Sequence, residues 1–226
     1  MCGRYTQTRT TRELCERFGA VEARAEAAPR FNIAPTDPVP VIVREPQGPV
    51  LLEMRWGLVP SWFSPEAKAT PRPINAKAET LSTSGMFKRL LPARRCLVAA
   101  DGFYEWQGPR TDRRPVRIRL QSGGTFAFAG LWDAWRDPRD RAAPPLLTCT
   151  IVTTEANELV RAVHDRMPAI LLPEDEARWL EPSLSDPREL TALLGPYPSA
   201  LLAVDQVSPL VNDVRNQSPA CILPLN

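Results

Sequence analysis

The sequence predicts an α+β domain built mainly from antiparallel strands. Apolar runs of strand length dominate the middle of the chain, and helical spacing occurs only in short segments around them. The 25 prolines, against 11 glycines, favour many short elements joined by rigid turns. We expect the strands to curl into a barrel-like core with peripheral short helices. A chain of 226 residues with 43% hydrophobic content can bury such a core as one domain spanning residues 1–226.

The strands are predicted from apolar runs that are bounded by turn residues. Val39–Val43 and Val50–Trp56 flank Pro46-Gln47-Gly48-Pro49 and predict a β-hairpin. Further strands are predicted at 96–106, 116–120, 125–132, 146–153, 169–172 and 201–207. The Pro- and Trp-rich segment 57–75 predicts a long surface loop, and such loops often carry function. Residues 31–36 are expected to be irregular.

The helices are predicted from their end signals. Thr10-Thr11-Arg12-Glu13 is a capping box and predicts a helix over 11–19. Pro173 followed by three acidic residues predicts a helix that runs through Leu180. Other short helices are predicted at 78–90, 155–162 and 186–194.

Composition excludes several classes of protein. The five cysteines are widely spaced without a CxxC pair, so we expect neither a disulfide framework nor a zinc site, and no other metal or cofactor. No apolar run reaches membrane-spanning length and no signal-peptide pattern opens the chain, so we expect a cytoplasmic protein.

The net charge of +2 is divided unevenly along the chain. Residues 1–120 carry +8 (20 Lys+Arg against 12 Asp+Glu), and residues 121–226 carry −6 (8 against 14). A basic half suits a polyanionic partner, although arginines on an ordinary surface would give the same count.

Cys2 carries the most informative chemistry. Once Met1 is removed, Cys2 holds a thiol and a free α-amine on adjacent carbons. In model compounds the amine titrates near pH ~8 and the thiol near ~8.5. The two groups together condense with an aldehyde, first to an imine and then to a five-membered thiazolidine ring. The alternative is that a small residue follows Met1 by accident of the translation start.

Two further side chains are candidate acid/base groups. The single histidine, His164, lies in a predicted turn and titrates near neutrality by default, although a lone histidine is often a surface or packed residue. Glu105 lies between Tyr104 and Trp106 at the end of an apolar strand. Desolvation there would raise its pKa and suit it to acid/base work. Strand alternation could instead point Glu105 to solvent.

Basic and aromatic side chains are candidates for binding nucleic acid. Asn75 and Lys77 precede a predicted helix start, where a lysine beside helix amides can bind phosphate, although these residues also suit a plain cap. Trp62 and Trp106 are among the aromatics that could stack on unpaired bases, whereas most aromatics of a folded domain pack in its core. A basic track could be extended by Arg4, Lys88, Arg89, Arg94, Arg95 and Arg166.

Seven blocks of sequence together resemble the SRAP (SOS response-associated peptidase) family. The blocks are residues 1–5 (Met-Cys-Gly-Arg-Tyr), 31–35, 55–62, 74–80, 94–98, 101–106 and 164–168, and the segment 207–212 extends the match. They occur in order and cover nearly the whole chain.

The resemblance implies the SRAP fold and a function on damaged DNA. Family members bind single-stranded DNA that carries an abasic site, and their N-terminal cysteine captures the sugar aldehyde as a thiazolidine crosslink that shields the lesion. By position, Cys2 is the nucleophile, Asn75 and Glu105 lie at the reacting sugar, and His164 assists proton transfer and later release. The residues carried over as DNA contacts are Arg4, Asn32, Trp62, Lys77, Trp106 and Arg166. Relatives often have an arginine at the position of Lys77. A lysine keeps the positive charge but lacks the guanidinium fork that makes bidentate hydrogen bonds.

Three functions are compared on this basis. The first is a monomeric abasic-site crosslinker, with hydrolase, peptidase or lyase character, that associates with the nucleoid at damaged DNA. Its aromatic loop around Trp62 could wedge at single-strand/duplex junctions. The second is a cysteine peptidase that uses Cys2 and His164, although only Met1 precedes Cys2. The third is a non-covalent single-strand binder, which leaves the position of Cys2 unexplained.

Overall fold

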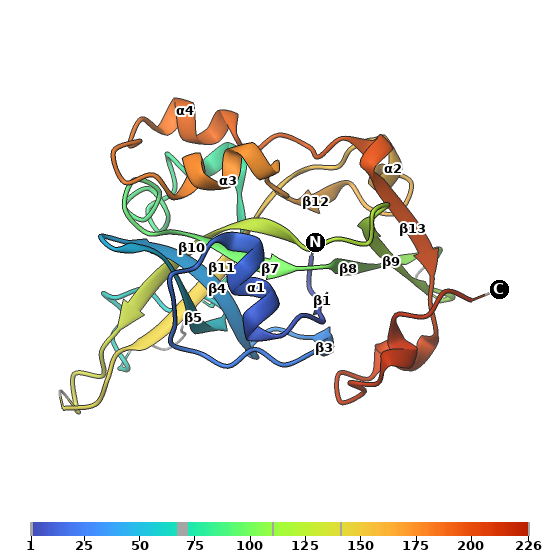
Figure 1. Cartoon of the computed structure of the whole chain (residues 1–226), viewed down its shortest axis with the longest axis horizontal. Helices are drawn as coiled ribbons and strands as arrows, with labels where there is room; N and C mark the ends of the chain where they lie inside the picture. The colour runs from blue at the N-terminus through green and yellow to red at the C-terminus, as the bar shows by residue number, and fades with distance from the viewer. Residues whose placement is uncertain (1, 67–71, 110, 141, 226) are drawn as a thin grey trace.

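The computed structural model of the protein describes residues 2–66, 72–109, 111–140 and 142–225. Its strands form two sheets (Figure 1). The smaller, five-stranded sheet has the order β13-β9-β8-β1-β3. Its members are β1 (Tyr5–Gln7), β3 (Arg30–Ile33), β8 (Gly102–Gln107), β9 (Arg114–Leu120) and β13 (Leu202–Gln206). The strand that follows Cys2, β1, therefore lies inside the sheet, between β3 and β8.

The larger, eight-stranded sheet has the order β12-β11-β10-β7-β4-β5-β2, and β6 pairs with β11 outside this path. Its members are β2 (Glu22–Ala23), β4 (Pro38–Glu45), β5 (Gly48–Trp56), β6 (Asn75–Lys77), β7 (Arg95–Ala100), β10 (Phe126–Trp135), β11 (Leu146–Glu155) and β12 (Arg166–Pro168). A short parallel pairing joins Thr148 and Cys149 of β11 to Arg55 and Trp56 of β5. The sheet is curled by this contact, but the sheets do not close into a true barrel. The predicted α+β class is confirmed.

Aromatic packing inside the curled sheet forms the main core. The ring of Tyr5 meets Trp56 and Phe128 edge-on, with centroid distances of 5.3 and 5.7 Å. Cys2 belongs to this same buried cluster. A second apolar cluster covers the opposite face of the larger sheet and includes Leu14 and Trp179 from the helices.

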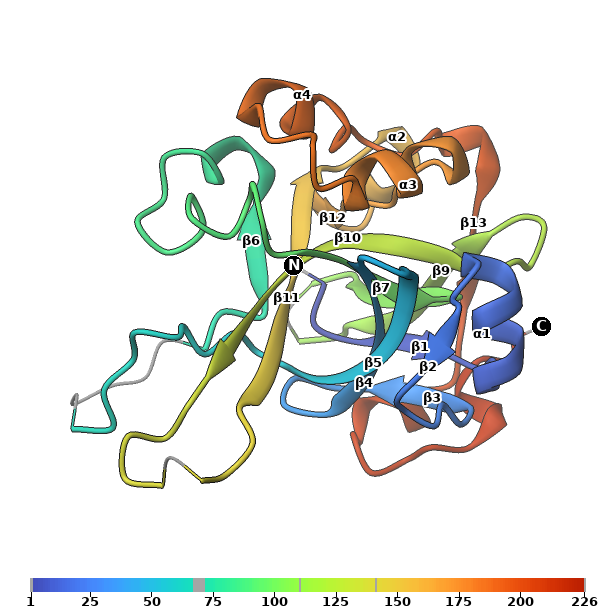
Figure 2. The same cartoon turned by 60° about the vertical axis from the view of Figure 1, so that its left-hand side comes forward.

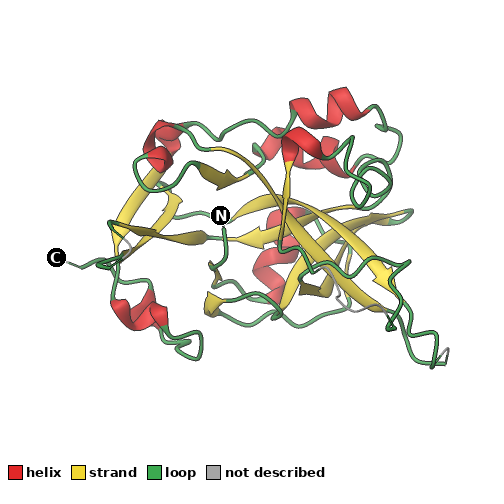
Figure 3. Cartoon of the chain, turned by 180° about the vertical axis from the view of Figure 1, so that it is seen from behind, coloured by secondary structure: helices red, strands yellow, loops and turns green. Residues whose placement is uncertain are grey.

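In the described part of the chain, four of the five predicted helices are present, and they lie around the sheets (Figure 3). They are α1 (Thr11–Phe18), α2 (Glu158–Arg161), α3 (Pro173–Leu180) and α4 (Pro187–Ala192). The capping box between Thr10 and Glu13 begins α1, and Gly19 ends it with a left-handed φ of 63°. Within the described residues no helix is long and apolar enough to span a membrane.

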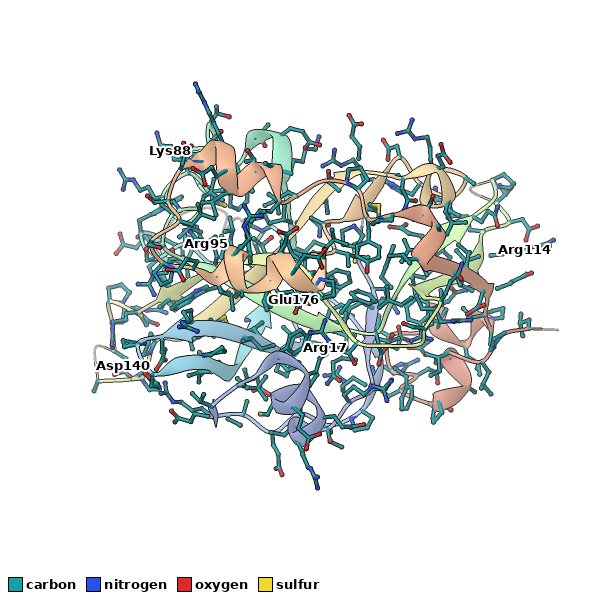
Figure 4. The ribbon with its side chains drawn as sticks, turned by 45° about the horizontal axis from the view of Figure 1, so that its top comes forward. Arg17, Lys88, Arg95, Arg114, Asp140 and Glu176 are labelled. Carbon is teal, nitrogen blue, oxygen red and sulfur yellow. The ribbon has the colours of Figure 1, made fainter. Side chains whose placement is uncertain are left out.

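Two arginines attach α3 to the rest of the protein (Figure 4). Arg17 of α1 makes a bidentate ion pair with Glu176 of α3, with both N–O distances 2.8 Å. Arg95 of β7 is buried and donates hydrogen bonds to the carbonyls of Trp179 and Glu181 at the end of α3. A cation beside these carbonyls also complements the helix dipole.

Several predicted elements differ from the structure. The helix predicted at 78–90 is a single 3-10 turn, η1 (Ala78–Thr80), followed by turns, because Ser82-Thr83-Ser84-Gly85 favours turns over helix. The last predicted strand before α3 lies at 166–168 rather than 169–172. Residues 31–36 are not wholly irregular, because β3 covers 30–33. Part of the predicted loop 57–75 lies outside the described residues, and its end forms β6.

The strand predicted at 96–106 is divided at Asp101 into β7 and β8, which belong to different sheets. The Asp101 side chain is 3% exposed and accepts hydrogen bonds from Thr6, Thr8 and Arg117. Arg117 reaches Asp101 across Gly102, where a Cβ would lie 2.5 Å from the arginine Nε. This buried cluster connects β1, β8 and β9. An uninterrupted strand over 96–106 would not place the Asp101 side chain where it makes these contacts.

Replacing Asp101 should therefore destabilise the fold strongly. Asp101→Ala leaves the Arg117 charge buried without its carboxylate, so we expect the free energy of unfolding to fall by about 3–5 kcal/mol. Chemical denaturation monitored by tryptophan fluorescence measures it. The control is Asp112→Ala, which removes an ion pair to Arg114 of 3.4 Å with side chains 69% and 67% exposed. That change should be worth only about 0–1 kcal/mol; equal losses for both variants would contradict the assignment.

Candidate functional site

The pairing of β1 with β8 places Cys2 near Glu105. Tyr5 lies opposite Phe103 and Thr6 opposite Gly102, and the Tyr104 amide donates to the Arg4 carbonyl over 2.9 Å. The same register puts Gly3, which has no side chain, opposite Glu105. The residue before Gly3 is Cys2, and the Glu105 charge is close enough to raise the pKa of the Cys2 thiol.

Cys2 is fully buried, with 0% of its surface exposed. Burial is the main cause that raises the pKa of its thiol, and Glu105 adds to the rise. Sγ is therefore protonated at neutral pH. Met1 lies outside the described residues, so its removal stays a prediction.

Glu105 is also buried, with 6% of its surface exposed, and does not face solvent. Desolvation raises its pKa from 4.5 to about 7, against the opposing charge of Arg113. Near neutral pH the carboxyl is thus present in both protonation states, which is the condition for donating and accepting a proton in one reaction.

β11 brings the other site segments together. Asn75 and Lys77 of β6 lie beside Ile151 and Thr153 of β11 in a parallel ladder. On the other edge of β11, β12 pairs in antiparallel fashion and begins at Arg166, just after His164. Figure 2 shows β6 and β12 on the two sides of the same end of β11. Segments almost ninety residues apart in sequence therefore meet here.

Asn75 has an unsatisfied acceptor. Its Nδ2 donates to the Ile74 carbonyl over 3.1 Å. Its Oδ1 is buried and accepts no hydrogen bond from any described residue. A buried amide oxygen without a donor is unfavourable by about 1–3 kcal/mol, so Oδ1 is ready to accept one from a ligand.

The histidine tautomer follows from its hydrogen bonds. Nδ1 of His164 accepts the Arg166 amide N–H over 3.0 Å, and Asp165 Oδ1 lies 2.8 Å from the same nitrogen. Nδ1 cannot both accept this N–H and carry a proton for Asp165. The Asp165 side chain is 85% exposed and its charge is screened, so we assign Nδ1 as the acceptor and the proton to Nε2. Burial lowers the pKa of His164, which favours this neutral form.

Arg4 and Trp106 are held by the C-terminal segment 207–212. Arg4 Nη1 donates to Asn32 Oδ1 over 2.6 Å and to the Val211 carbonyl over 2.8 Å, and its guanidinium lies 5.7 Å from the Trp106 ring centroid. Trp106 Nε1 donates to Asn212 Oδ1 over 2.7 Å. The segment 207–212 extended the family resemblance in the sequence, but no role was predicted for it. In the structure this segment positions both side chains.

Asn32 has no surface with which to touch DNA in this structure. It is 0% exposed, and its Nδ2 donates to the carbonyls of Val211 and Asp213. Its part in the site is to orient Arg4. No sequence signal distinguished this positioning role from direct contact.

Trp62, in contrast, is 60% exposed. The neighbouring backbone is braced against β10, because the Ser61 amide donates to Asp133 Oδ2 over 2.7 Å and Trp135 Nε1 donates to the Phe63 carbonyl over 2.9 Å. A flat aromatic surface on a braced loop suits stacking on a base.

The two remaining predicted phosphate ligands differ in availability. Lys77 is exposed. Arg166 is bound by Glu79 through two hydrogen bonds of 2.6 and 2.9 Å. Among the described residues no group of His, Cys, Asp and Glu side chains suits a metal ion.

Cavity volume alone would point elsewhere. A cavity of about 530 Å³ lies beside β4, β5 and the start of β11 and is lined by residues outside the site, including Pro38, Met54 and Leu146. The acid/base residues lie elsewhere, on β8 (Glu105) and in the turn before β12 (His164), and the charge of Asp165 in that turn acts on Glu105.

Comparisons with known proteins agree with the resemblance in the sequence. The family model described as SOS response associated peptidase (SRAP) matches residues 1–214. The chain is 42% identical to the abasic site processing protein YoqW of Bacillus subtilis, over 98% of this chain and 99% of that protein. It is 34% identical to the abasic site processing protein HMCES of Gallus gallus, over 87% of this chain and 66% of that protein.

Solved structures are similar over the same extent. A protein from Bacteroides thetaiotaomicron superposes with a TM-score of 0.90 and covers all of both chains, with 24% identity, so this likeness supports the fold alone. A phage-related protein from Bordetella bronchiseptica has a TM-score of 0.70 and 29% identity, over 91% of this chain and 94% of that one.

The pKa of Glu105 predicts a pH dependence of stability. Between pH 4.5 and about 7 the folded protein holds the Glu105 proton more tightly than the unfolded chain, so this group makes the free energy of unfolding fall as pH rises. Its contribution over that window is about 3 kcal/mol. Glu105→Gln should remove this part of the slope, measured by urea unfolding at pH 5 and pH 8. Glu53→Gln, an exposed site on β5, should keep the wild-type slope; an unchanged slope in Glu105→Gln would contradict the raised pKa.

Proposed function

Because this chain belongs to the SRAP family, we propose that it processes abasic sites in single-stranded DNA by forming a covalent crosslink through Cys2. The observation that carries the proposal is the position of Cys2, just before β1 and two residues from Arg4, beside a carboxyl whose pKa is about 7. The crosslink would protect the lesion during repair.

The first step is attack by the amine. An abasic deoxyribose opens from its ring to an aldehyde at C1′ when the C1′ hydroxyl loses its proton and the ring oxygen gains one. A neutral His164 is suited to assist by donating a hydrogen bond from its Nε2–H to that ring oxygen. The free amine of Cys2, exposed by removal of Met1, adds to the aldehyde carbon to give a carbinolamine. Model α-amines titrate near ~8, so a useful fraction is neutral in the cell.

Glu105 then serves as both acid and base. Its protonated form donates to the carbinolamine hydroxyl, which leaves as water and gives the imine. The nitrogen keeps its proton at this stage, so the imine is the protonated (iminium) form. The Cys2 sulfur adds to the same carbon, which neutralises the nitrogen, and the thiol proton passes to the Glu105 carboxylate and restores its acid form. The product is a thiazolidine, formed with the net loss of one water. Reversal of these steps, with the uptake of one water, would release the unaltered abasic strand and regenerate Cys2.

The surroundings suit a single strand. Arg4 and Lys77 supply positive charge for phosphates, Trp62 and Trp106 supply aromatic surface, and Asn75 Oδ1 is a ready acceptor beside the reacting sugar. The exposed Trp62 could also wedge at a junction with duplex DNA. We expect the protein to act as a monomer in the cytoplasm, on the nucleoid where DNA is damaged.

A cysteine peptidase is the competing function. Its nucleophile is a thiolate, normally made by a neighbouring histidine that lowers the thiol pKa. Burial and Glu105 raise the pKa of Cys2 instead. A protonated thiol suits addition to an imine better than attack on a peptide bond.

The two nucleophiles of Cys2 can be tested separately with an abasic oligonucleotide and intact-mass analysis. Wild-type protein should give a heat-stable adduct whose mass is the sum of both partners minus one water. Cys2→Ala, which keeps the terminal amine, should give an adduct only when borohydride reduces the imine. An N-terminal extension that blocks the amine should abolish both products.

Cys15→Ala, at a half-buried position of α1, is the matched control and should form the adduct as wild type does. A stable adduct with Cys2→Ala, without reductant, would overturn the proposal. Equal affinity for intact and abasic strands with no adduct in the wild type would favour a non-covalent binder.

Glu105→Gln should slow adduct formation by about 100-fold or more, because general acid/base catalysis contributes about 10²–10⁴. The affinity for intact single-stranded DNA should change little. Quench-flow sampling at saturating DNA measures the rate, and the wild-type rate should change around pH 7, with that inflection lost in the variant. Glu53→Gln is the charge-matched control. An unaltered rate in Glu105→Gln would remove this side chain from the mechanism.

A further inference from the structure

Three of the five N–H donors of Arg166 are used within the protein. Nη1 and Nη2 donate to the two carboxylate oxygens of Glu79 over 2.6 and 2.9 Å, and Nη2 also donates to the Thr153 carbonyl over 2.7 Å. Nε is buried and has no acceptor among the described residues. Of the five N–H donors of an arginine, one on Nη1 is left for a ligand. A bidentate contact to phosphate is therefore blocked.

Glu79 occupies the place that a phosphate would take. A carboxylate and a phosphate present oxygens with the same spacing to the guanidinium fork, so they compete for it. Hydrogen bonds from Arg166 are the main cause that lowers the pKa of Glu79, and the charge of Lys77 lowers it further. Glu79 is thus ionised at neutral pH and cancels the Arg166 charge beside the site.

The pair is partly accessible rather than locked in the core. The Glu79 side chain is 44% exposed, whereas Arg166 is 15% exposed. Glu79 belongs to the one-turn η1 that follows β6, and Arg166 begins β12, so the pair bridges the two segments that flank β11. Rotation of the Glu79 side chain toward water would free the fork without moving either strand.

We propose that Glu79 is a specificity-determining residue that competes with DNA phosphate for Arg166. Resting on the proposed function, the consequence is that intact single strands are held weakly and released. Strands with an abasic aldehyde are retained because capture by Cys2 is covalent. A tighter phosphate site would increase affinity for every single strand and occupy the protein on undamaged DNA.

The test is the affinity of Glu79→Gln for an intact single-stranded oligonucleotide, measured by fluorescence anisotropy over a series of salt concentrations. We expect Kd to fall about 3- to 10-fold at low salt. The slope of log Kd against log salt should steepen by about 0.7, the value for one more phosphate contact on a single strand. Because glutamine can still accept one bond from Arg166, Glu79→Ser is a second variant that should tighten binding at least as much.

Glu45→Gln is the matched control. Glu45 makes the same bidentate contact to Arg24, with distances of 2.8 and 2.9 Å, on the β4–β5 hairpin. The Glu45→Gln substitution removes one negative charge without freeing Arg166. Equal tightening in Glu45→Gln and Glu79→Gln would assign the effect to net charge and overturn the proposal. Weaker binding by Glu79→Gln and Glu79→Ser would overturn it too, and make Glu79 a residue that orients Arg166.

Arg166→Ala supplies an internal check. In that background Glu79→Gln should change Kd no more than Glu45→Gln does, and a larger change would contradict competition for Arg166. In a mixture of intact and abasic strands, Glu79→Gln should also capture the abasic strand more slowly than wild type. These binding measurements use intact DNA and need no adduct. Failure of the wild type to form an adduct would count against the proposed function, separately from the competition at Arg166.

Discussion

The buried contact between Asp101 and Arg117 is the constraint on which the rest of the site depends. Asp101 breaks one run of strand into β7 and β8, and it accepts hydrogen bonds from Thr6 of β1 and from Thr8 just after that strand. The register that follows puts Gly3 opposite Glu105 and Cys2 beside it. A paired, hydrogen-bonded charge can be buried here because each partner satisfies the other. The N-terminus is thereby held inside a sheet, where termini usually fray.

Desolvation sets the protonation states around Cys2. It raises the pKa of the thiol and lowers that of His164, so both are neutral near pH 7, and it raises the pKa of Glu105 to about 7, so this carboxyl is present in both protonation states. These states suit imine chemistry, because the thiol must be able to give a proton and Glu105 must be able both to give and to take one. The charges lie farther out, on Arg4, Lys77 and the Arg166–Glu79 pair, where a phosphate backbone would run.

The fold was predictable wherever a local pattern is strong. The hairpin of β4 and β5, the capping box of α1 and the Pro-acidic start of α3 each depend on neighbours in sequence, and each is present. The three-residue strands β1, β6 and β12 were not predictable, because such short strands are defined by partners far along the chain. The helix expected over 78–90 was wrong because local turn formers outweighed its apolar spacing.

The sequence by itself determined which chemistry is available: a cysteine after Met1, one histidine, a glutamate between aromatics and a basic first half. Only the tertiary structure decided how those groups are used. Burial of Asn32 turned an expected contact into a support for Arg4, and Glu79 was found on the fork of Arg166. Protonation and availability depend on neighbours brought together across the sheets. No local pattern around Asn32 or Arg166 encodes which side chains will occupy their hydrogen bonds.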